Sequence, residues 1–158
     1  MEIAHNLADS LKEVLLDGKW VTGTNIKNEI MNLDWKTAII KIDSLNSIAD
    51  LTFHIDYYLA GVLNVFEGKK LEIKDKYSFD YKQIESQKDW EQLINKFCVD
   101  SEKFVETVKK FSNEDLEKNF VKKEYGNYFR NLTVMSEHSY YHLGQIILIK
   151  KLIKQRNS

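Results

Sequence analysis

The feature that most constrains the fold is the complete absence of proline from the 158 residues. Proline breaks helices more strongly than any other residue, because it lacks a backbone N–H and clashes with the preceding turn. Every turn must therefore be made by other residues, and the chain has only six glycines. Strict alternation of apolar and polar residues, which is typical of half-buried strands, is hard to find. The sequence therefore predicts an all-α chain.

Apolar residues recur at helical spacing in four long stretches. These stretches predict helices over residues 2–17, 48–66, 87–110 and 128–154. Shorter helices are expected over 113–119 and in two pieces between residues 18 and 46, which Thr24 and Asp34 would cap. The stretch over residues 67–85 predicts a flexible loop that holds a short strand or lines a site.

A serine followed three residues later by an aspartate marks the start of three of these helices. The pairs are Ser47 with Asp50, Ser86 with Asp89, and Ser112 with Asp115. In this pattern the serine hydroxyl accepts a hydrogen bond from a backbone N–H of the first turn, and the acid bonds back to the serine. The four long helices predict a single domain over residues 1–158, folded as a four-helix bundle with short extra helices in the connections.

The charge balance argues against a nucleic-acid partner. The chain has 23 basic and 24 acidic residues and a net charge of −1, whereas proteins that bind nucleic acid usually carry a basic excess. A basic run near the C-terminus fits the end of a helix, whose dipole favours cations, better than it fits a nucleic-acid patch. This run contains Lys150, Lys151, Lys154 and Arg156.

Cysteine content and hydropathy restrict the compartment. Cys98 is the only cysteine, so the chain can form neither an internal disulfide nor a cysteine-based metal cluster. A reducing, cytoplasmic location is therefore expected. No apolar run approaches the ~18 residues that a membrane span needs, and the acidic first segment does not resemble a signal peptide. We expect no membrane partner.

The predicted helix over residues 48–66 carries one histidine on a largely apolar face. His54 shares that face with Leu51, Tyr58 and Val65. Its ring is therefore expected to point inward or into a seam between helices. A lone histidine in such a place is more often a satisfied core residue than a metal ligand.

The last predicted helix carries two histidines one turn apart on a core-facing stripe. Residues at i and i+4 have Cβ atoms roughly 6 Å apart, so His138 and His142 can bind one ion from one helix face. A metal would occupy one nitrogen of each buried ring. Polar neighbours such as Asn131 or Gln145 would satisfy the rings without a metal. The spacing alone leaves both interpretations open.

The histidines belong to two segments that together resemble a known family. Residues 47–54 read SIADLTFH and residues 138–146 read HSYYHLGQI. This pair resembles the DinB/YfiT-like superfamily of metalloenzymes, and the Gly/Trp turn over residues 18–23 is similar to the turn after the first helix in one branch of it. The resemblance covers essentially the whole chain, in the same helix order.

The resemblance implies a four-helix bundle with up-down-down-up topology. It implies that His54, His138 and His142 bind one divalent ion, usually nickel or zinc. Gly144 would let another backbone or a ligand approach, and Gln145 would support the bundle or the metal ligands. Members are often homodimers that act on small molecules. Some are thiol transferases that use bacillithiol, mycothiol or glutathione, and others are metal-dependent hydrolases.

The leading hypothesis is therefore a metal-dependent hydrolase or low-molecular-weight-thiol transferase. Three neutral nitrogen ligands leave a coordination position open, as in catalytic sites, and a water or thiol bound there is more easily deprotonated. No catalytic residue is assigned, because Glu137 and Asp56 point away from the neighbouring histidines on their helices. The alternative is a binding or interaction module without turnover, in which the histidines line a pocket.

Overall fold

The computed structural model describes residues 2–156. Over this range the chain forms seven α-helices and no β-strand, so the prediction of an all-α fold is confirmed. The bounds are α1 Glu2–Lys12, α2 Ile26–Met31, α3 Trp35–Ala38, α4 Ile48–Phe66, α5 Gln87–Val108, α6 Asn113–Glu117 and α7 Tyr128–Arg156. No helix within residues 2–156 is both long enough and apolar enough to cross a membrane.

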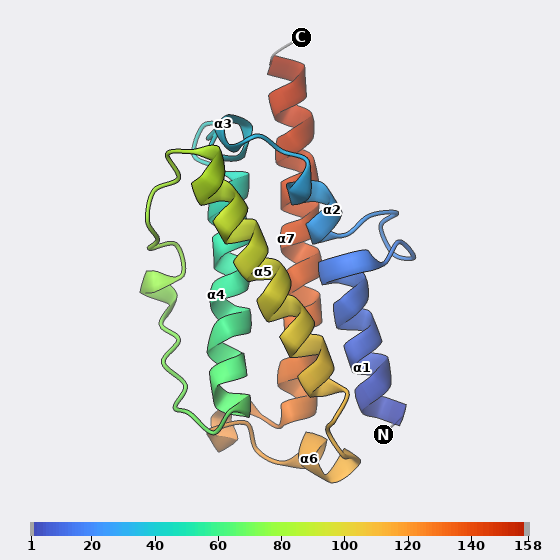
Figure 1. The fold of residues 1–158 in the computed structure, drawn as a ribbon. Coiled ribbons are helices and arrows are strands. Elements are labelled where there is room, and N and C mark those ends of the chain that lie inside the picture. The colour runs from blue at the N-terminus through green and yellow to red at the C-terminus, as the bar shows by residue number, and fades with distance from the viewer. Residues whose placement is uncertain (1, 157–158) are drawn as a thin grey trace.

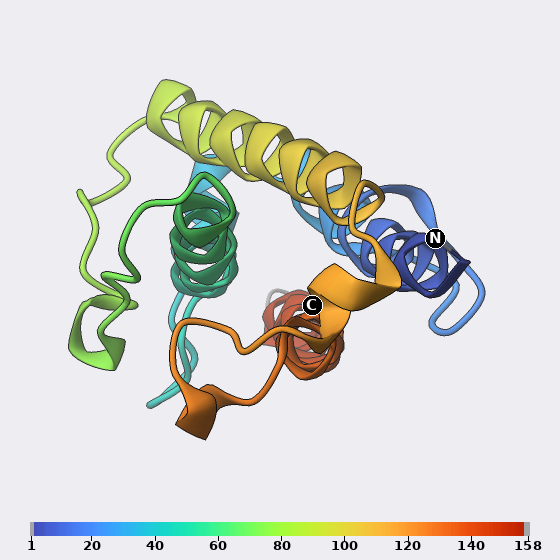
Figure 2. The same ribbon diagram turned by 90° about the horizontal axis from the view of Figure 1, so that it is seen from below.

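The four long helices enclose one core. α5 contacts α1 and α4, and α7 contacts the same two helices. α1 and α7 run in one direction, and α4 and α5 run in the other (Figure 1). Since α4 and α5 are parallel, the segment between them returns along the outside of α4, as the view from below shows (Figure 2). The core contains fully buried side chains such as Leu59, Phe97 and Phe104.

The predicted serine caps begin three of the helices. At α4 the Ser47 hydroxyl accepts from the Asp50 N–H at 3.1 Å, and the Asp50 carboxylate accepts from the Ser47 N–H at 2.8 Å. The same reciprocal box forms at Ser112 before α6, and Ser86 caps α5. Asp34 caps α3 as predicted. Because these bonds are local, they fix the helix starts independently of packing.

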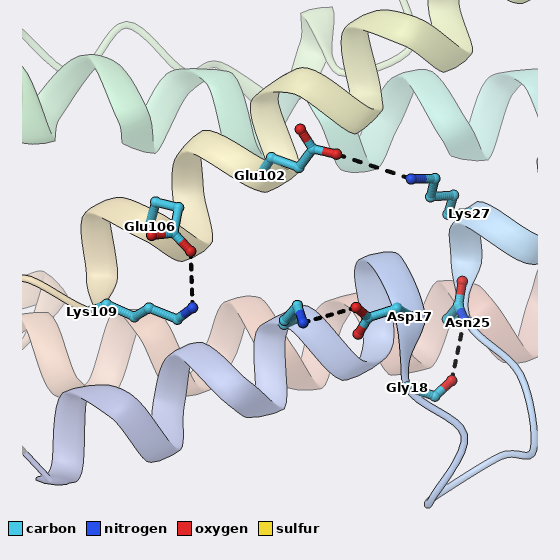
Figure 3. Close-up of polar contacts among 8 residues, drawn as sticks. Asp17, Gly18, Asn25, Lys27, Glu102, Glu106 and Lys109 are labelled. Atoms are coloured by element: carbon cyan, nitrogen blue, oxygen red, sulfur yellow. Dashed lines mark hydrogen bonds and ion pairs between the residues drawn. The ribbon is translucent and has the colours of Figure 1, made fainter.

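The turn between α1 and α2 differs from the prediction. Glu13–Asp17 form a π-helix rather than the last turn of α1. α2 is capped by Asn25 and not by Thr24: the Asn25 amide oxygen accepts from the Asn28 N–H at 2.9 Å, and its amide nitrogen donates to the Gly18 carbonyl at 3.2 Å (Figure 3). Asparagine carries both an acceptor and two donors, so it can cap the helix and close the loop together.

Gly18 ends the π-helix, and we expect Gly18→Ala to lower the free energy of unfolding by about 1–3 kcal/mol. A Cβ at this position would lie 1.9 Å from Cγ and 2.4 Å from Cα of Glu13. The matched control is Gly144→Ala in α7, where the new Cβ would have no atom within 4 Å. This control should stabilise the protein by about 0.5–1 kcal/mol, because alanine favours helix more than glycine does. Urea unfolding measures both, and equal effects would contradict the prediction.

The connection between α4 and α5 is held against α4 by tyrosine hydroxyls. The Tyr57 hydroxyl accepts from the Lys74 N–H at 2.9 Å and donates to the Lys74 carbonyl at 3.2 Å. The Tyr81 hydroxyl donates to the Asp50 carboxylate at 2.9 Å. The expected short strand is absent from this connection, which instead contains the 3₁₀ turn Asp75–Tyr77.

Candidate metal centre

Three histidines from α4 and α7 meet in the seam between these helices. Ring nitrogens of His54, His138 and His142 all lie within 4.8 Å of one another. The Nε2 atom of His138 is 3.1 Å from Nε2 of His54 and 2.9 Å from Nε2 of His142. His54 and His142 are buried, and His138 is partly buried. The three rings lie close enough to hold one metal ion.

Neighbouring carbonyl oxygens orient two of these rings. The Nδ1 atom of His54 is 3.3 Å from the backbone carbonyl of Ser78, and the Nδ1 atom of His142 is 2.7 Å from the side-chain oxygen of Gln145. An oxygen acceptor requires a proton on Nδ1, so Nε2 of each neutral ring carries a lone pair. The expected supporting role of Gln145 agrees with this contact.

The donor set fits a cation at the centre of the cluster. The lone pairs of His54 and His142 both face Nε2 of His138, at 3.1 and 2.9 Å. A neutral His138 has at most one N–H at this atom, so it can satisfy only one of the two lone pairs. A divalent ion accepts all three lone pairs at once, and second-shell oxygens on Nδ1 are typical of metal-bound imidazoles.

The surroundings keep the three rings neutral. Burial, together with the neighbouring His142, lowers the pKa of His54 to about 4. Burial and the two other rings lower the pKa of His138 to about 4. Burial also lowers the pKa of His142, against the opposing hydrogen bond to Gln145. Neutral imidazole is the form that binds metal, so protons do not compete for these nitrogens near neutral pH.

We expect the metal-free protein to lose stability as the pH falls from about 7 to about 5. The pKa of His54 and of His138 is about 4 in the folded protein against 6.5 for an ordinary histidine. Between these values the unfolded chain binds more protons, so the free energy of unfolding is greatest above the higher value and decreases below it. Urea unfolding in the presence of a chelator measures this loss.

The control for this titration is His54→Gln, which removes one of the two depressed pKa values. The variant should lose less stability than the wild type over the same pH range. An identical pH dependence would mean that the ring of His54 titrates normally in the folded protein.

Aromatic residues enclose the cluster on the side of the α4–α5 connection. The ring of Phe79 stacks on His54, with centroids 4.3 Å apart. Tyr58 presents its ring edge-on to His54 and His138, with centroids at 5.0 and 5.2 Å. Its hydroxyl donates to Asp75 at 2.7 Å. Burial and this carboxylate raise the pKa of Tyr58 to about 12, so the hydroxyl stays protonated.

The residues excluded as general bases lie away from the cluster. Glu137 is exposed and pairs with Arg130 at 3.5 Å. Asp56 is buried against α5, where it accepts from Lys96 at 2.6 Å. Gly144 was expected to allow another backbone or a ligand to approach, but among the described residues no atom beyond the neighbouring backbone of α7 lies within 4 Å of a Cβ placed there. Within one chain, therefore, no other backbone uses this glycine.

The fold and the cluster define an all-helical protein with a candidate three-histidine metal site. The chain belongs to the sequence family described as "Protein of unknown function (DUF1572)", which matches residues 15–158. That range contains all three histidines and helices α2 to α7. No curated protein and no solved structure matches the chain. The family description assigns no activity, so the function is argued from the site.

Proposed function

We propose that the protein is a DinB/YfiT-like metalloenzyme in which His54, His138 and His142 hold one divalent ion, nickel or zinc. The convergence of three neutral Nε2 atoms in one seam carries this proposal. The directions of α1, α4, α5 and α7 support a four-helix bundle of up-down-down-up topology (Figure 1). The reaction is hydrolysis of a small molecule or transfer of a low-molecular-weight thiol to it.

The residues of the site have separable tasks in this proposal. The three imidazoles would hold the ion and leave one of its coordination positions open. The ion would supply Lewis-acid chemistry that lowers the pKa of a water or thiol bound at that position. Ser78 and Gln145 hold protons on the outer nitrogens of two rings and so aim their lone pairs inward. Phe79 covers His54 and limits the access of water to it.

The compartment and the assembly are proposed from the cysteine content and from the resemblance of the sequence. The single cysteine fits a reducing compartment, and we place the protein in the cytoplasm. The sequence resembles a superfamily whose members are often dimers, so we propose that this protein forms a homodimer. Sedimentation equilibrium of the purified protein measures the mass of the assembly.

Metal content of tag-free protein tests the proposed site. Elemental mass spectrometry should find about one equivalent of a divalent metal in the wild type, as the donor count of one site requires. The metal should be lost from both His54→Ala and His138→Ala. The matched control is His5→Ala, which changes an exposed histidine on α1. A wild-type protein that is metal-free and also fails to bind added zinc or nickel would refute the proposal.

A reaction assay then separates the two activities from simple binding. The metal-loaded protein is incubated with small electrophiles, with and without a thiol, and products are identified by mass spectrometry. Product that needs the thiol indicates transfer, and product without it indicates hydrolysis. No product from any combination would favour the alternative of a binding module.

A further inference from the structure

A cavity of about 450 Å³ lies beside the histidine cluster. It is bounded by α4, α7, the α4–α5 connection and the α6–α7 connection. Tyr58 belongs to its wall and also contacts the rings of His54 and His138, so this side chain lies between the cavity and the cluster. Most of the wall is apolar and consists of Val62, Leu71, Ile73, Phe120, Val134 and Met135.

Two polar groups of the wall, Asp75 and Asn131, offer acceptors, while the exposed Tyr125 hydroxyl can either donate or accept. Tyr58 uses its hydroxyl proton on one oxygen of Asp75, which leaves the other carboxylate oxygen to accept. Asn131 uses its amide nitrogen on the carbonyls of Tyr125 and Asn127, each at 2.8 Å, which leaves its amide oxygen. A ligand that satisfies these groups must therefore bring donors of its own.

The charged group that lines the cavity is negative. Among the residues that the structure describes, the cavity is lined by the carboxylate of Asp75 and by no lysine or arginine. Three aromatic side chains, Tyr58, Phe120 and Tyr125, also line it. Aromatic faces and a carboxylate attract organic ammonium groups. A carboxylate-bearing thiol such as glutathione would find no lysine or arginine in the wall itself, although the Lys122 ammonium lies over the Tyr125 ring, 6.0 Å from its centroid.

We propose that this cavity binds small amines with an apolar body and serves as the substrate pocket of the histidine site. The apolar wall would hold the body of the molecule, and Asp75 and Asn131 would accept from its N–H groups. The role as a substrate pocket rests on the proposed metal function. Binding of the amine does not, because the cavity is formed by residues other than the three histidines.

Three probes of nearly equal shape test the pocket: 1-naphthylmethylamine, 1-naphthylmethanol and 1-naphthoate. Isothermal titration calorimetry is carried out on chelator-treated protein, so that the result does not depend on a metal. We expect the amine to bind about tenfold or more tightly than the carboxylate, with the alcohol between them. A carboxylate that binds as tightly as the amine would overturn the proposal, as would the absence of binding by all three probes.

Two variants locate the binding. Val134→Trp fills the cavity from its partly exposed rim and should abolish binding of the amine. Its matched control is Leu148→Trp, at an exposed α7 position that lines a separate cavity of about 250 Å³ and should leave binding unchanged. Equal effects of the two tryptophans would place the probe elsewhere and refute the assignment.

Asp75→Asn tests the charge preference without filling the cavity. The variant should weaken binding of the amine to the affinity of the alcohol, and it should leave the affinity of the alcohol unchanged. An unchanged preference for the amine would refute the role of Asp75. A wild-type protein that has its metal but binds no amine contradicts only the pocket. A wild-type protein that binds the amine but takes up no metal contradicts only the metal function.

Discussion

Removal of the His138 side chain is expected to abolish the stabilisation of the protein by zinc. In the wild type, free zinc at about 100 times its Kd should raise the free energy of unfolding by about 2.7 kcal/mol, because only the folded chain brings the ligands together. His138 lies 3.1 and 2.9 Å from the two other rings and is central to the cluster. His138→Ala leaves one histidine on each of two helices, and the zinc-dependent increase should fall close to zero.

Thermal unfolding with added zinc and with a chelator measures this effect. His5→Ala, on the exposed side of α1, should retain the full zinc-dependent increase. Since burial holds the pKa of His138 at about 4, removal of this ring should also reduce the loss of metal-free stability at acidic pH. If zinc stabilised His138→Ala as strongly as the wild type, the ion would bind elsewhere.

The largest effect on stability is expected from Trp90→Ala, which should lower the free energy of unfolding by about 3–5 kcal/mol. Trp90 is 0% exposed in the first turn of α5. Its indole N–H donates to the Leu33 carbonyl at 3.1 Å and so joins α5 to the connection between α2 and α3. The variant leaves a cavity in the core, and it also leaves the Leu33 carbonyl without its hydrogen-bond donor. Urea unfolding at neutral pH measures the change.

Two further tryptophan variants separate the causes of this loss. Trp90→Phe keeps an aromatic ring but removes the donor, and it should cost less than Trp90→Ala. Trp20→Ala removes a side chain that is 93% exposed and should change the free energy of unfolding by less than about 0.5 kcal/mol. Similar losses for Trp20→Ala and Trp90→Ala would mean that burial does not determine the cost.

The helix starts that were predictable depend on residues close together in the chain. The pairing of Ser47 with Asp50 places the start of α4 at Ile48, as expected from the sequence. The start of α2 is also capped locally, because the Asn25 side chain accepts from the Asn28 N–H, and Asn25 bonds in addition to the Gly18 carbonyl seven residues away. Thr24 and Asn25 are both residue types that favour this position, and the spacing of apolar residues does not distinguish them.

The same division applies to the candidate site. His138, His142 and Gln145 lie within two turns of one helix, so helical spacing alone places them together. The partners of His54 do not follow from spacing. Ser78 lies 24 residues away in an irregular connection, and Phe79 follows it. The only sequence signal was the length of this connection, which suggested a segment that lines a site.

The tyrosine bonds join the α4–α5 connection to α4, so the histidine site is built from two parts of the chain. Between Lys74 and Tyr81 the connection is bonded to α4, so His54, Ser78 and Phe79 belong to one body. The other half, including Gln145, is carried by α7 alone. A small slide of α7 along α4 therefore changes the distances between the rings without breaking any bond inside either half. The geometry of the three rings therefore depends on how α4 and α7 pack against each other.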